Sequence, residues 1–312
     1  MKKSRLAQRK LGTKPKSKPK KKSFFKIILI PVFLVVFIIV LFYIFSPKVW
    51  DGKSKFVVSV QSSSHDVQVL ILDPANSLIT TLFIPSQTEV QAANQLGTWK
   101  IGSITKLGHD KKLGEDFLKN SIIKSFSFPI DFNVDESFLD LVSGNLPKEF
   151  KAIFVGGFSE VSAIDKIRIA LFSLQISNAS RFNVDLSKTN ELERVRLDDG
   201  SLGFKVAGNI PTNIESYFVA YDNAHMLNLL INNATSMNQY ASITSKVVEI
   251  LGANVASIQY QSPSDFDCKV TGLSKDIVLK IARVFSCEVN LVKPVNNFDI
   301  QIDIGKKFKD RF

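Results

Sequence analysis

The chain has 312 residues, 45% of them hydrophobic, and a formal net charge of +11 at pH 7. The positive charge is concentrated at one end, because residues 1–26 contain twelve Lys and Arg residues and no Asp or Glu. The remaining chain has 28 basic and 29 acidic residues, so it lacks the basic surface expected of a nucleic-acid-binding protein. We therefore expect no nucleic acid among its partners.

The basic tail and the apolar stretch that follows it predict a membrane anchor. Residues 27–45 carry no charge, and roughly 20 apolar residues span the hydrocarbon core of a bilayer. The positive-inside rule places the preceding charges in the cytoplasm and the rest of the chain outside. A cleaved signal peptide would have a shorter apolar region and a small-x-small site, which this sequence lacks.

We therefore predict a basic, disordered cytoplasmic tail over residues 1–24 and a signal-anchor helix over residues 25–46. The chain would then be a single-pass protein of the plasma membrane, with the lipid bilayer as a partner of residues 25–46.

The first part of the exported chain alternates between strand and helix patterns, which is typical of an α/β domain. We place this domain at residues 50–215. Strands are predicted where short apolar, β-branched runs end in turn signals, at residues 55–60, 67–72, 78–84 and 150–155. Helices are predicted where apolar residues repeat at helical spacing, at residues 114–126, 138–142 and 161–174. Residues 183–210 have the composition of strands and turns.

Residues 222–308 predict a second, smaller domain with the element order β-α-β-β-α-β-β, an α/β sandwich. Its helices are predicted at residues 241–251, where Gly252 is placed to end the first, and 275–285, where Ser274 is placed to cap the second. The strands are predicted at residues 226–232, 254–259, 268–271, 288–292 and 298–304.

Cys268 and Cys287 are the two cysteines of the chain, and each lies beside a predicted strand. A strand–helix–strand segment can bring its two ends back to the separation that a disulfide needs, and an oxidising compartment permits the bond. Two alternatives stay open, a disulfide or two buried thiols. The histidines His65, His109 and His225 lack the spacing of zinc ligands, so we expect no metal site.

Several short motifs in the exported chain resemble those of the LytR-CpsA-Psr family. In chain order they are Ser64-His65-Asp66, Asp73-Pro74, residues 83–88 (FIPSQT), residues 97–103 (GTWKIGS) and residues 128–132 (FPIDF). The resemblance covers residues 57–134 and weakens toward residue 215. It implies enzymes that move a glycopolymer from a polyprenyl-pyrophosphate lipid to the cell wall, with arginines and Mg²⁺ neutralising the pyrophosphate.

The charged residues of the family pattern are mostly replaced in this chain. The arginine expected before Asp66 is Ser64, and the Arg-Asp pair expected further on is Ser86-Gln87. Only Asp66 and Lys100 match charged positions, so they are the candidate catalytic residues if the chain is active. Without two phosphate-binding cations, electrostatic stabilisation of the transition state is lost.

The resemblance therefore implies a degenerate relative, and we assign it neither catalytic residues nor a cofactor. Mg²⁺ would be a cofactor only if transferase activity remained. Arg194 and Arg196 do not replace the missing arginines, because they alternate with Glu193 and Asp198 as in a solvated charged strand.

Residues 222–308 resemble the LytR C-terminal domain, found behind LytR-CpsA-Psr domains in bacterial envelope proteins. The matching pieces are residues 229–235 (LLINNAT), 250–255 (ILGANV) and 302–305 (IDIG). The resemblance attaches no catalytic residue to this domain and implies binding or scaffolding.

These observations predict a membrane-anchored extracytoplasmic envelope protein that binds or scaffolds cell-wall polymer or partner proteins without catalysis. Two alternatives remain. One is an active phosphotransferase that moves a glycopolymer from the lipid carrier to the wall, and the other is a bitopic scaffold for division or pilus assembly.

Overall fold

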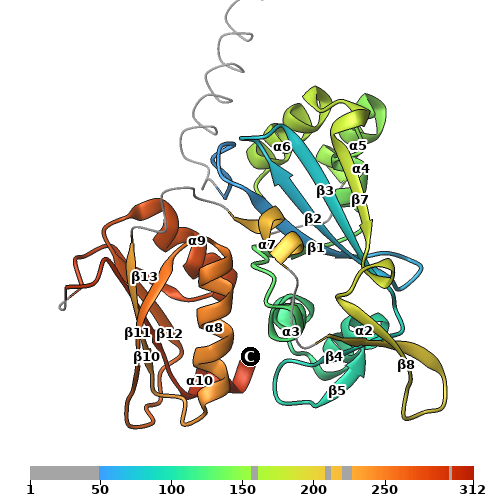
Figure 1. Ribbon diagram of the computed structural model, residues 1–312. Helices are drawn as coiled ribbons and strands as arrows, with labels where there is room; N and C mark the ends of the chain where they lie inside the picture. The colour runs from blue at the N-terminus through green and yellow to red at the C-terminus, as the bar shows by residue number, and fades with distance from the viewer. Residues whose placement is uncertain (1–48, 156–160, 208–211, 220–226, 295–296) are drawn as a thin grey trace, which may run out of the picture. The chain divides into compact units, whose positions relative to one another are not determined.

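The computed structural model describes residues 49–155, 161–207, 212–219, 227–294 and 297–312 (Figure 1). The predicted tail (1–24) and anchor (25–46) lie outside these residues. Within the described ranges, none of the helices combines the length and the apolar character needed to cross a bilayer. From residue 48 onward the chain forms one compact unit with a mixed α/β fold.

The first sheet has five strands in the order β6-β1-β2-β3-β7. The strands are β1 (Phe56–Gln61), β2 (Val67–Asp73), β3 (Leu78–Ile84), β6 (Phe132–Val134) and β7 (Arg181–Asp185). The first three form an antiparallel meander, and β6 and β7 pair in parallel with β1 and β3. The three strands expected between residues 55 and 84 are thus present within a residue of their predicted bounds.

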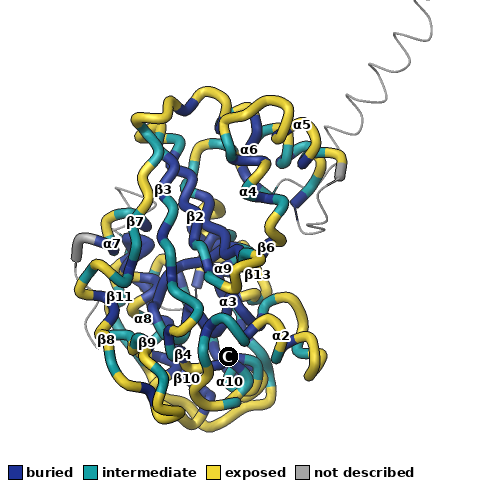
Figure 2. Tube along the Cα trace, turned by 90° about the vertical axis from the view of Figure 1, so that its right-hand side faces the viewer, coloured by how far each residue is buried: buried dark blue, intermediate teal, exposed yellow. Residues whose placement is uncertain are grey.

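Strands β1 and β2 are buried on both faces of the sheet, in keeping with the almost continuously apolar sequence of β2 (Figure 2). On one face, alternate residues of β1 and β2 join a cluster that we call the α3 cluster, which includes Val57, Val69, Ile71, Phe117 and Ile122. On the other face, the intervening residues join the α4–α6 cluster, which includes Trp50, Phe56, Val58, Leu70, Leu72, Phe138 and Ile169.

Helices cover both faces of the first sheet. The α4–α6 cluster is closed by α4 (Ser137–Leu141), α5 (Leu146–Val155) and α6 (Ala163–Gln175), and the α3 cluster includes α2 (Ile101–Lys111) and α3 (Asp116–Phe126). The helices predicted at residues 114–126, 138–142 and 161–174 are present. The sequence analysis did not predict α2.

The strand predicted at residues 150–155 is wrong, because these residues belong to helix α5. The apolar residues of this segment suit a strand, but Asn145 supplies a helix start: its side-chain oxygen accepts a hydrogen bond from the Lys148 amide at 3.3 Å. Packing of Ala152 into the α4–α6 cluster then favours the helix. Tertiary context has overridden the local preference for strand.

A second sheet of four strands has the order β5-β4-β9-β8. The sequence analysis predicted strands and turns over residues 183–210 and did not predict β4 and β5. The strands are β4 (Thr88–Gln91), β5 (Thr98–Lys100), β8 (Leu192–Arg196) and β9 (Leu202–Val206), and the short helices nearby are η1 (Asn178–Ser180), η2 (Leu186–Lys188) and α7 (Thr212–Phe218).

The third sheet contains the C-terminal strands in the order β11-β10-β14-β12-β13. Its elements are β10 (Asn228–Asn233), α8 (Asn238–Ile250), β11 (Asn254–Tyr260), β12 (Cys268–Gly272), α9 (Lys275–Phe285), β13 (Glu288–Asn290), β14 (Ile300–Ile304) and α10 (Lys306–Arg311). Up to β14 this is the predicted order. Gly252 follows α8 with a φ of +100°, as a helix-ending glycine does. Ser274 is the N-cap residue of α9, as predicted, but its side chain makes no capping hydrogen bond.

The first and third sheets share one core within the compact unit. Residues 222–308 were predicted as a separate domain, but the α3 cluster includes Phe117 and Ile122 of α3 together with Val247 of α8 and Ile281 of α9. The two halves are therefore joined by a continuous hydrophobic contact as well as by the chain.

A buried ion pair crosses the same boundary. The Lys280 ammonium of α9 lies 2.5 Å from a carboxylate oxygen of Asp131, just before β6, and donates to the backbone carbonyl of Lys55 at 2.9 Å. The same Asp131 oxygen accepts the Val57 amide, and Arg283 lies 3.7 Å from the other. Burial lowers the pKa of Lys280 and the carboxylate opposes that shift. The charges are thus compensated inside the protein.

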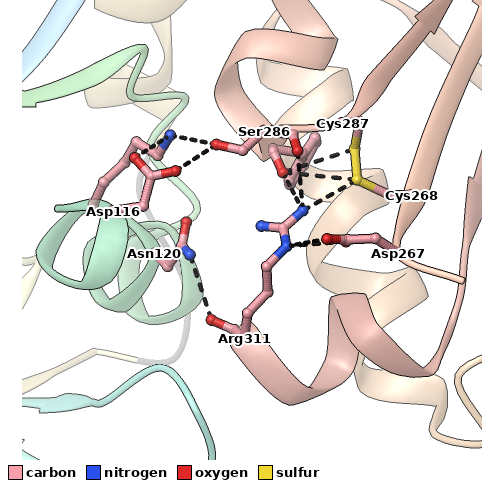
Figure 3. A network of polar contacts seen from close by, with 9 residues as sticks. Asp116, Asn120, Asp267, Cys268, Ser286, Cys287 and Arg311 are labelled. Carbon is pink, nitrogen blue, oxygen red and sulfur yellow. Dashed lines mark hydrogen bonds and ion pairs between the residues drawn. A yellow bond between two sulfur atoms is a disulfide. The ribbon is translucent and has the colours of Figure 1, made fainter. Parts of the chain in front are cut away.

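A second polar network joins α3 to the C-terminal residues (Figure 3). The Ser286 hydroxyl donates to Asp116 at 2.6 Å, and the Asn120 amide donates to the Arg311 carbonyl at 3.4 Å. Beside this network, the structure bonds the sulfur atoms of Cys268 and Cys287, whose Cα atoms are 4.9 Å apart. Of the two alternatives left open by the sequence, the structure adopts the disulfide.

Removing one partner of the buried pair should destabilise the fold strongly. Lys280→Met leaves the Asp131 carboxylate buried beside a single, more distant cation, and loss of one partner of a buried pair costs about 3–5 kcal/mol. The free energy of unfolding in urea measures the effect. Asp131→Leu combined with Lys280→Met should cost less than the sum of the two single changes; additive costs would contradict the coupling.

The disulfide should add to stability outside the cytoplasm. The bond joins two residues that are 19 positions apart in the sequence. Because it restricts the unfolded chain, such a crosslink stabilises the folded state by about 3 kcal/mol. We expect the double variant Cys268→Ala/Cys287→Ala to lose about that much free energy of unfolding. Mass analysis before and after reduction provides the control, since two alkylatable thiols in the untreated protein would rule out the bond.

Candidate functional site

The motif residue Asp66 lies at a corner where three of the sequence motifs meet. One of its carboxylate oxygens accepts the Ser86 amide at 2.8 Å, and the other accepts the Ser64 hydroxyl at 3.2 Å. The Ser86 carbonyl in turn accepts the Gly102 amide at 3.0 Å. A Cβ at Gly102 would lie 2.7 Å from the Ser86 Cβ, so only glycine fits there. The Asp66 carboxylate therefore holds the corner together.

The other candidate, Lys100, is paired with an acidic residue from a distant turn. Its ammonium lies 2.6 Å from a carboxylate oxygen of Asp199 and 3.0 Å from the Ser201 hydroxyl, in the turn between β8 and β9. The Asp199 carboxylate also accepts hydrogen bonds from the Ser201 hydroxyl and amide, and together with the bond from Lys100 these hold the pKa of Asp199 well below its usual range. Among the described residues, no ion pair joins Lys100 to Asp66. The structure thus does not bring the two candidates together as a charged pair.

The two arginines of β8 are exposed, as a solvated strand predicts. The Arg196 guanidinium donates to the Gly200 carbonyl at 3.0 Å within the same hairpin, and Arg194 faces solvent beside Glu193. Neither residue replaces the cations missing from the family pattern.

Asp66 is the one carboxylate among the two candidate catalytic residues, and so the group that would hold Mg²⁺ in an active enzyme. In the described part of the chain, no three His, Cys, Asp or Glu side chains come together as a metal site. Mg²⁺ in proteins is held by one or two carboxylates together with phosphate oxygens. Both carboxylate oxygens of Asp66 accept hydrogen bonds from the protein, so this side chain serves the corner.

A different place gathers positive charge: a cleft of about 400 Å³ bounded by the second sheet, α3 and α8. The polar side chains that line it are Glu89, Gln91, Thr98, Lys124, Ser125, Ser127, Lys205 and Lys246. We call it the lysine cleft. The β4–β9 pairing brings Glu89 beside Lys205.

Three lysines and one carboxylate, that of Glu89, line the cleft. Lys205 lies 3.5 Å from Glu89, whereas Lys124 and Lys246 have no carboxylate within ion-pair distance among the described residues. The Lys124 ammonium donates to the Ala92 carbonyl at 3.4 Å and lies 5.9 Å from the centre of the Tyr240 ring. Burial lowers the pKa of Lys124. A bound anion would favour the charged form and so gain binding energy.

The cleft has the chemistry of a binding site for a hydroxylated polyanion. Ammonium groups bind phosphate or carboxylate as point charges, while the Thr98 and Ser125 hydroxyls and the Gln91 amide can meet sugar or polyol hydroxyls. The Ser125 hydroxyl accepts a hydrogen bond from the backbone N–H of Gln91 at 2.8 Å. No histidine or cysteine is among the described residues that line the cleft. The lining can therefore hold such a ligand through charge and hydrogen bonds.

Sequence reasoning missed the lysine cleft. Lys124, Lys205 and Lys246 come from α3, β9 and α8, and no motif links them. The parallel pairing of β4 with β9 and the packing of α8 near α3 bring them together. Because both arrangements are tertiary, no local signal marked the site.

No family model matches the chain. No curated protein matches it either.

Among solved structures, its neighbours include proteins of the LytR-CPS2A-psr family. TagV of Bacillus subtilis is 13% identical with a TM-score of 0.37, and the match covers 54% of this chain and 95% of TagV. The Lin1025 protein of Listeria innocua is 13% identical with a TM-score of 0.35, covering 50% and 92%. TagT of Bacillus subtilis is 15% identical with a TM-score of 0.33, covering 52% and 88%.

These neighbours agree with the family resemblance found in the sequence, at low identity and over about half of this chain. Likeness at these TM-scores carries no functional argument of its own, so the function has to be inferred from this chain's residues.

Glu191, beside the lysine cleft, should make stability depend on pH. Its carbonyl accepts the amide of the cleft residue Ala207, and its carboxylate is buried without a hydrogen-bond partner among the described residues. Burial and the nearby Glu215 raise the pKa of Glu191 from 4.5 to about 7. The folded state then holds a proton that the unfolded state has lost, so stability falls as the pH rises from 4.5 to about 7.

Glu191→Gln should remove this dependence and make the protein more stable than the wild type at pH 8. Thermal unfolding followed from pH 4.5 to pH 8 measures the effect. Glu193→Gln, an exposed change two residues further along the chain, is the matched control and should leave the profile unchanged. Identical profiles for wild type and Glu191→Gln would contradict the assignment.

Proposed function

We propose that this chain is a single-pass, extracytoplasmic envelope protein of the plasma membrane that binds an anionic cell-wall polymer without catalysis. Its N-terminus would lie in the cytoplasm and residues 25–46 would anchor it. The observation that carries the proposal is the lysine cleft, in which three ammonium groups face one carboxylate. A polymer with regularly spaced phosphates or carboxylates complements this arrangement.

Both candidate catalytic residues already have partners within the protein, and this supports a non-catalytic role. Lys100 is engaged by Asp199, and Asp66 is engaged by backbone and hydroxyl donors. A pyrophosphate leaving group needs cations aimed at its oxygens. Among the described residues, no Lys or Arg side chain forms an ion pair with Asp66. Partner proteins of the envelope are a second kind of ligand for such a scaffold.

TagT, one of the structural neighbours, has been solved with bound octaprenyl pyrophosphate lipid and bound to LIIa-WTA. Those ligands are properties of TagT. For this chain they define the two probes that separate the binding proposal from the phosphotransferase alternative, namely a wall polymer and a polyprenyl-pyrophosphate lipid with Mg²⁺.

Binding of isolated anionic wall polymer to the full chain in detergent should depend on the lysine cleft. Exposed charge pairs are worth about 0.2–1 kcal/mol each. Lys205→Gln combined with Lys246→Gln should therefore weaken binding about tenfold, or about 1.4 kcal/mol. The effect should shrink as salt is added. Lys307→Gln, at an exposed position of α10, is the matched control and should bind as the wild type does.

Other outcomes would overturn the proposal in distinct ways. Binding of the polyprenyl-pyrophosphate lipid that requires Mg²⁺ and weakens in Asp66→Ala would favour the phosphotransferase. Binding of neither polymer nor lipid would favour the assembly scaffold. Polymer binding that the two lysine changes do not affect would move the site away from the cleft.

A further inference from the structure

Helices α5 and α6 carry an apolar surface that the proposed function does not use. Three exposed residues of α5 recur at a spacing of four: Leu146 at 63% exposure, Phe150 at 62% and Phe154 at 72%. On α6 the exposed apolar residues are Ile167, Leu171 and Leu174, which also follow helical spacing. We call these six side chains the α5–α6 face. Large exposed apolar groups gathered in one place mark an interaction surface.

The face points away from the core of the protein. The opposite sides of the two helices are buried, since Ala152 of α5 and Ile169 and Ala170 of α6 belong to the α4–α6 cluster. Figure 2 shows both helices beside each other, with exposed stretches along each. The rings of Phe150 and Phe154 contact each other with their centres 4.9 Å apart. No described segment covers these rings, given their exposure.

The chain enters the described structure against α6, one of these two helices. The Val49 amide donates to the buried carboxylate of Asp165 on α6 at 2.8 Å. Arg168 of α6 donates to the Trp50 carbonyl at 3.1 Å, and the Trp50 ring is buried in the α4–α6 cluster. Residues 49 and 50 are therefore tied firmly to α6.

The short tether limits how far α6 can lie from the membrane. The predicted apolar stretch ends at residue 45, four residues before Val49. An extended chain advances at most about 3.6 Å per residue, so Val49 lies within about 14 Å of the end of that stretch. A helix tied to Val49 is thus held near the headgroups.

The polar residues around the face suit a membrane surface. Lys148 and Lys151 are exposed on α5, and the one acidic residue of that helix, Glu149, is buried. A helix with apolar side chains on one side and lysines beside them inserts its apolar side into the boundary between headgroups and acyl chains. Lysines at that depth are attracted to anionic lipids.

We infer that the α5–α6 face rests on the outer surface of the bilayer in which the chain is anchored, with Phe150 and Phe154 among the acyl chains. The inference rests on the anchored topology of the proposed function. The occupant is a lipid surface that contains anionic headgroups. The contact holds the exported unit at a fixed orientation on the membrane.

The test uses the full chain in vesicles of anionic and zwitterionic lipid, with brominated lipids as quenchers of tryptophan fluorescence. Phe154→Trp places a reporter on the face, and Tyr260→Trp places a matched reporter on exposed β11. The signal of the wild-type tryptophans, Trp50 and Trp99, is subtracted. We expect the reporter at 154 to be quenched at least about twofold more than the one at 260.

A second set of variants tests the charge. Lys148→Glu combined with Lys151→Glu, added to Phe154→Trp, should reduce the quenching in anionic vesicles and leave it unchanged in zwitterionic ones. Quenching that is equal at positions 154 and 260 would overturn the inference. A blue shift at 154 that follows the protein-to-lipid ratio without quenching would assign the face to a second copy and would also overturn it.

The outcomes separate this inference from the proposed function. If the chain fails to float with the vesicles, the anchored topology itself fails. If it floats and binds polymer but the reporter at 154 is not quenched, only the membrane contact of α5 and α6 fails.

Discussion

The buried pair of Asp131 and Lys280 is the contact on which the arrangement of the molecule depends. Taking two charges out of water is costly, and the cost is offset here because Asp131 also accepts the Val57 amide while Lys280 also donates to the Lys55 carbonyl. Breaking the contact would leave a charge buried without its partner. The pair therefore sets α9, and with it the third sheet, against the start of the first sheet.

The lysine cleft follows from that constraint. Lys246 belongs to α8 of the third sheet, whereas Lys124 and Lys205 belong to α3 and to the second sheet. The core shared by α3, α8 and α9 brings these elements to one place. The family motifs meet at Asp66, which has a structural role there. The lysines of the cleft lie instead where α3 and the second sheet meet α8. The proposed binding site therefore lies apart from the family motifs.

The two faces of the first sheet pack against different hydrophobic clusters. The α4–α6 cluster receives Trp50, where the described chain begins, and supports the helices that carry the α5–α6 face. The α3 cluster lies on the opposite face and continues into the third sheet. Alternate residues of β1, such as Phe56 and Val57, point into the two clusters. The sheet therefore separates the side proposed to meet the membrane from the side that leads to the lysine cleft.

Local pattern alone determined most of the elements: β1 to β3 and α3, α8 and α9 follow from residue periodicity, because side chains alternate along a strand and repeat every three or four residues along a helix. Pattern failed at residues 150–155, where a strand-like run became α5 once the Asn145 cap and the sheet beneath it were in place. It also could not assemble the lysine cleft or the pairing of Lys100 with Asp199, because these residues are far apart in the chain. Only the tertiary structure decides such contacts, since they depend on which strands pair and which helices share a core.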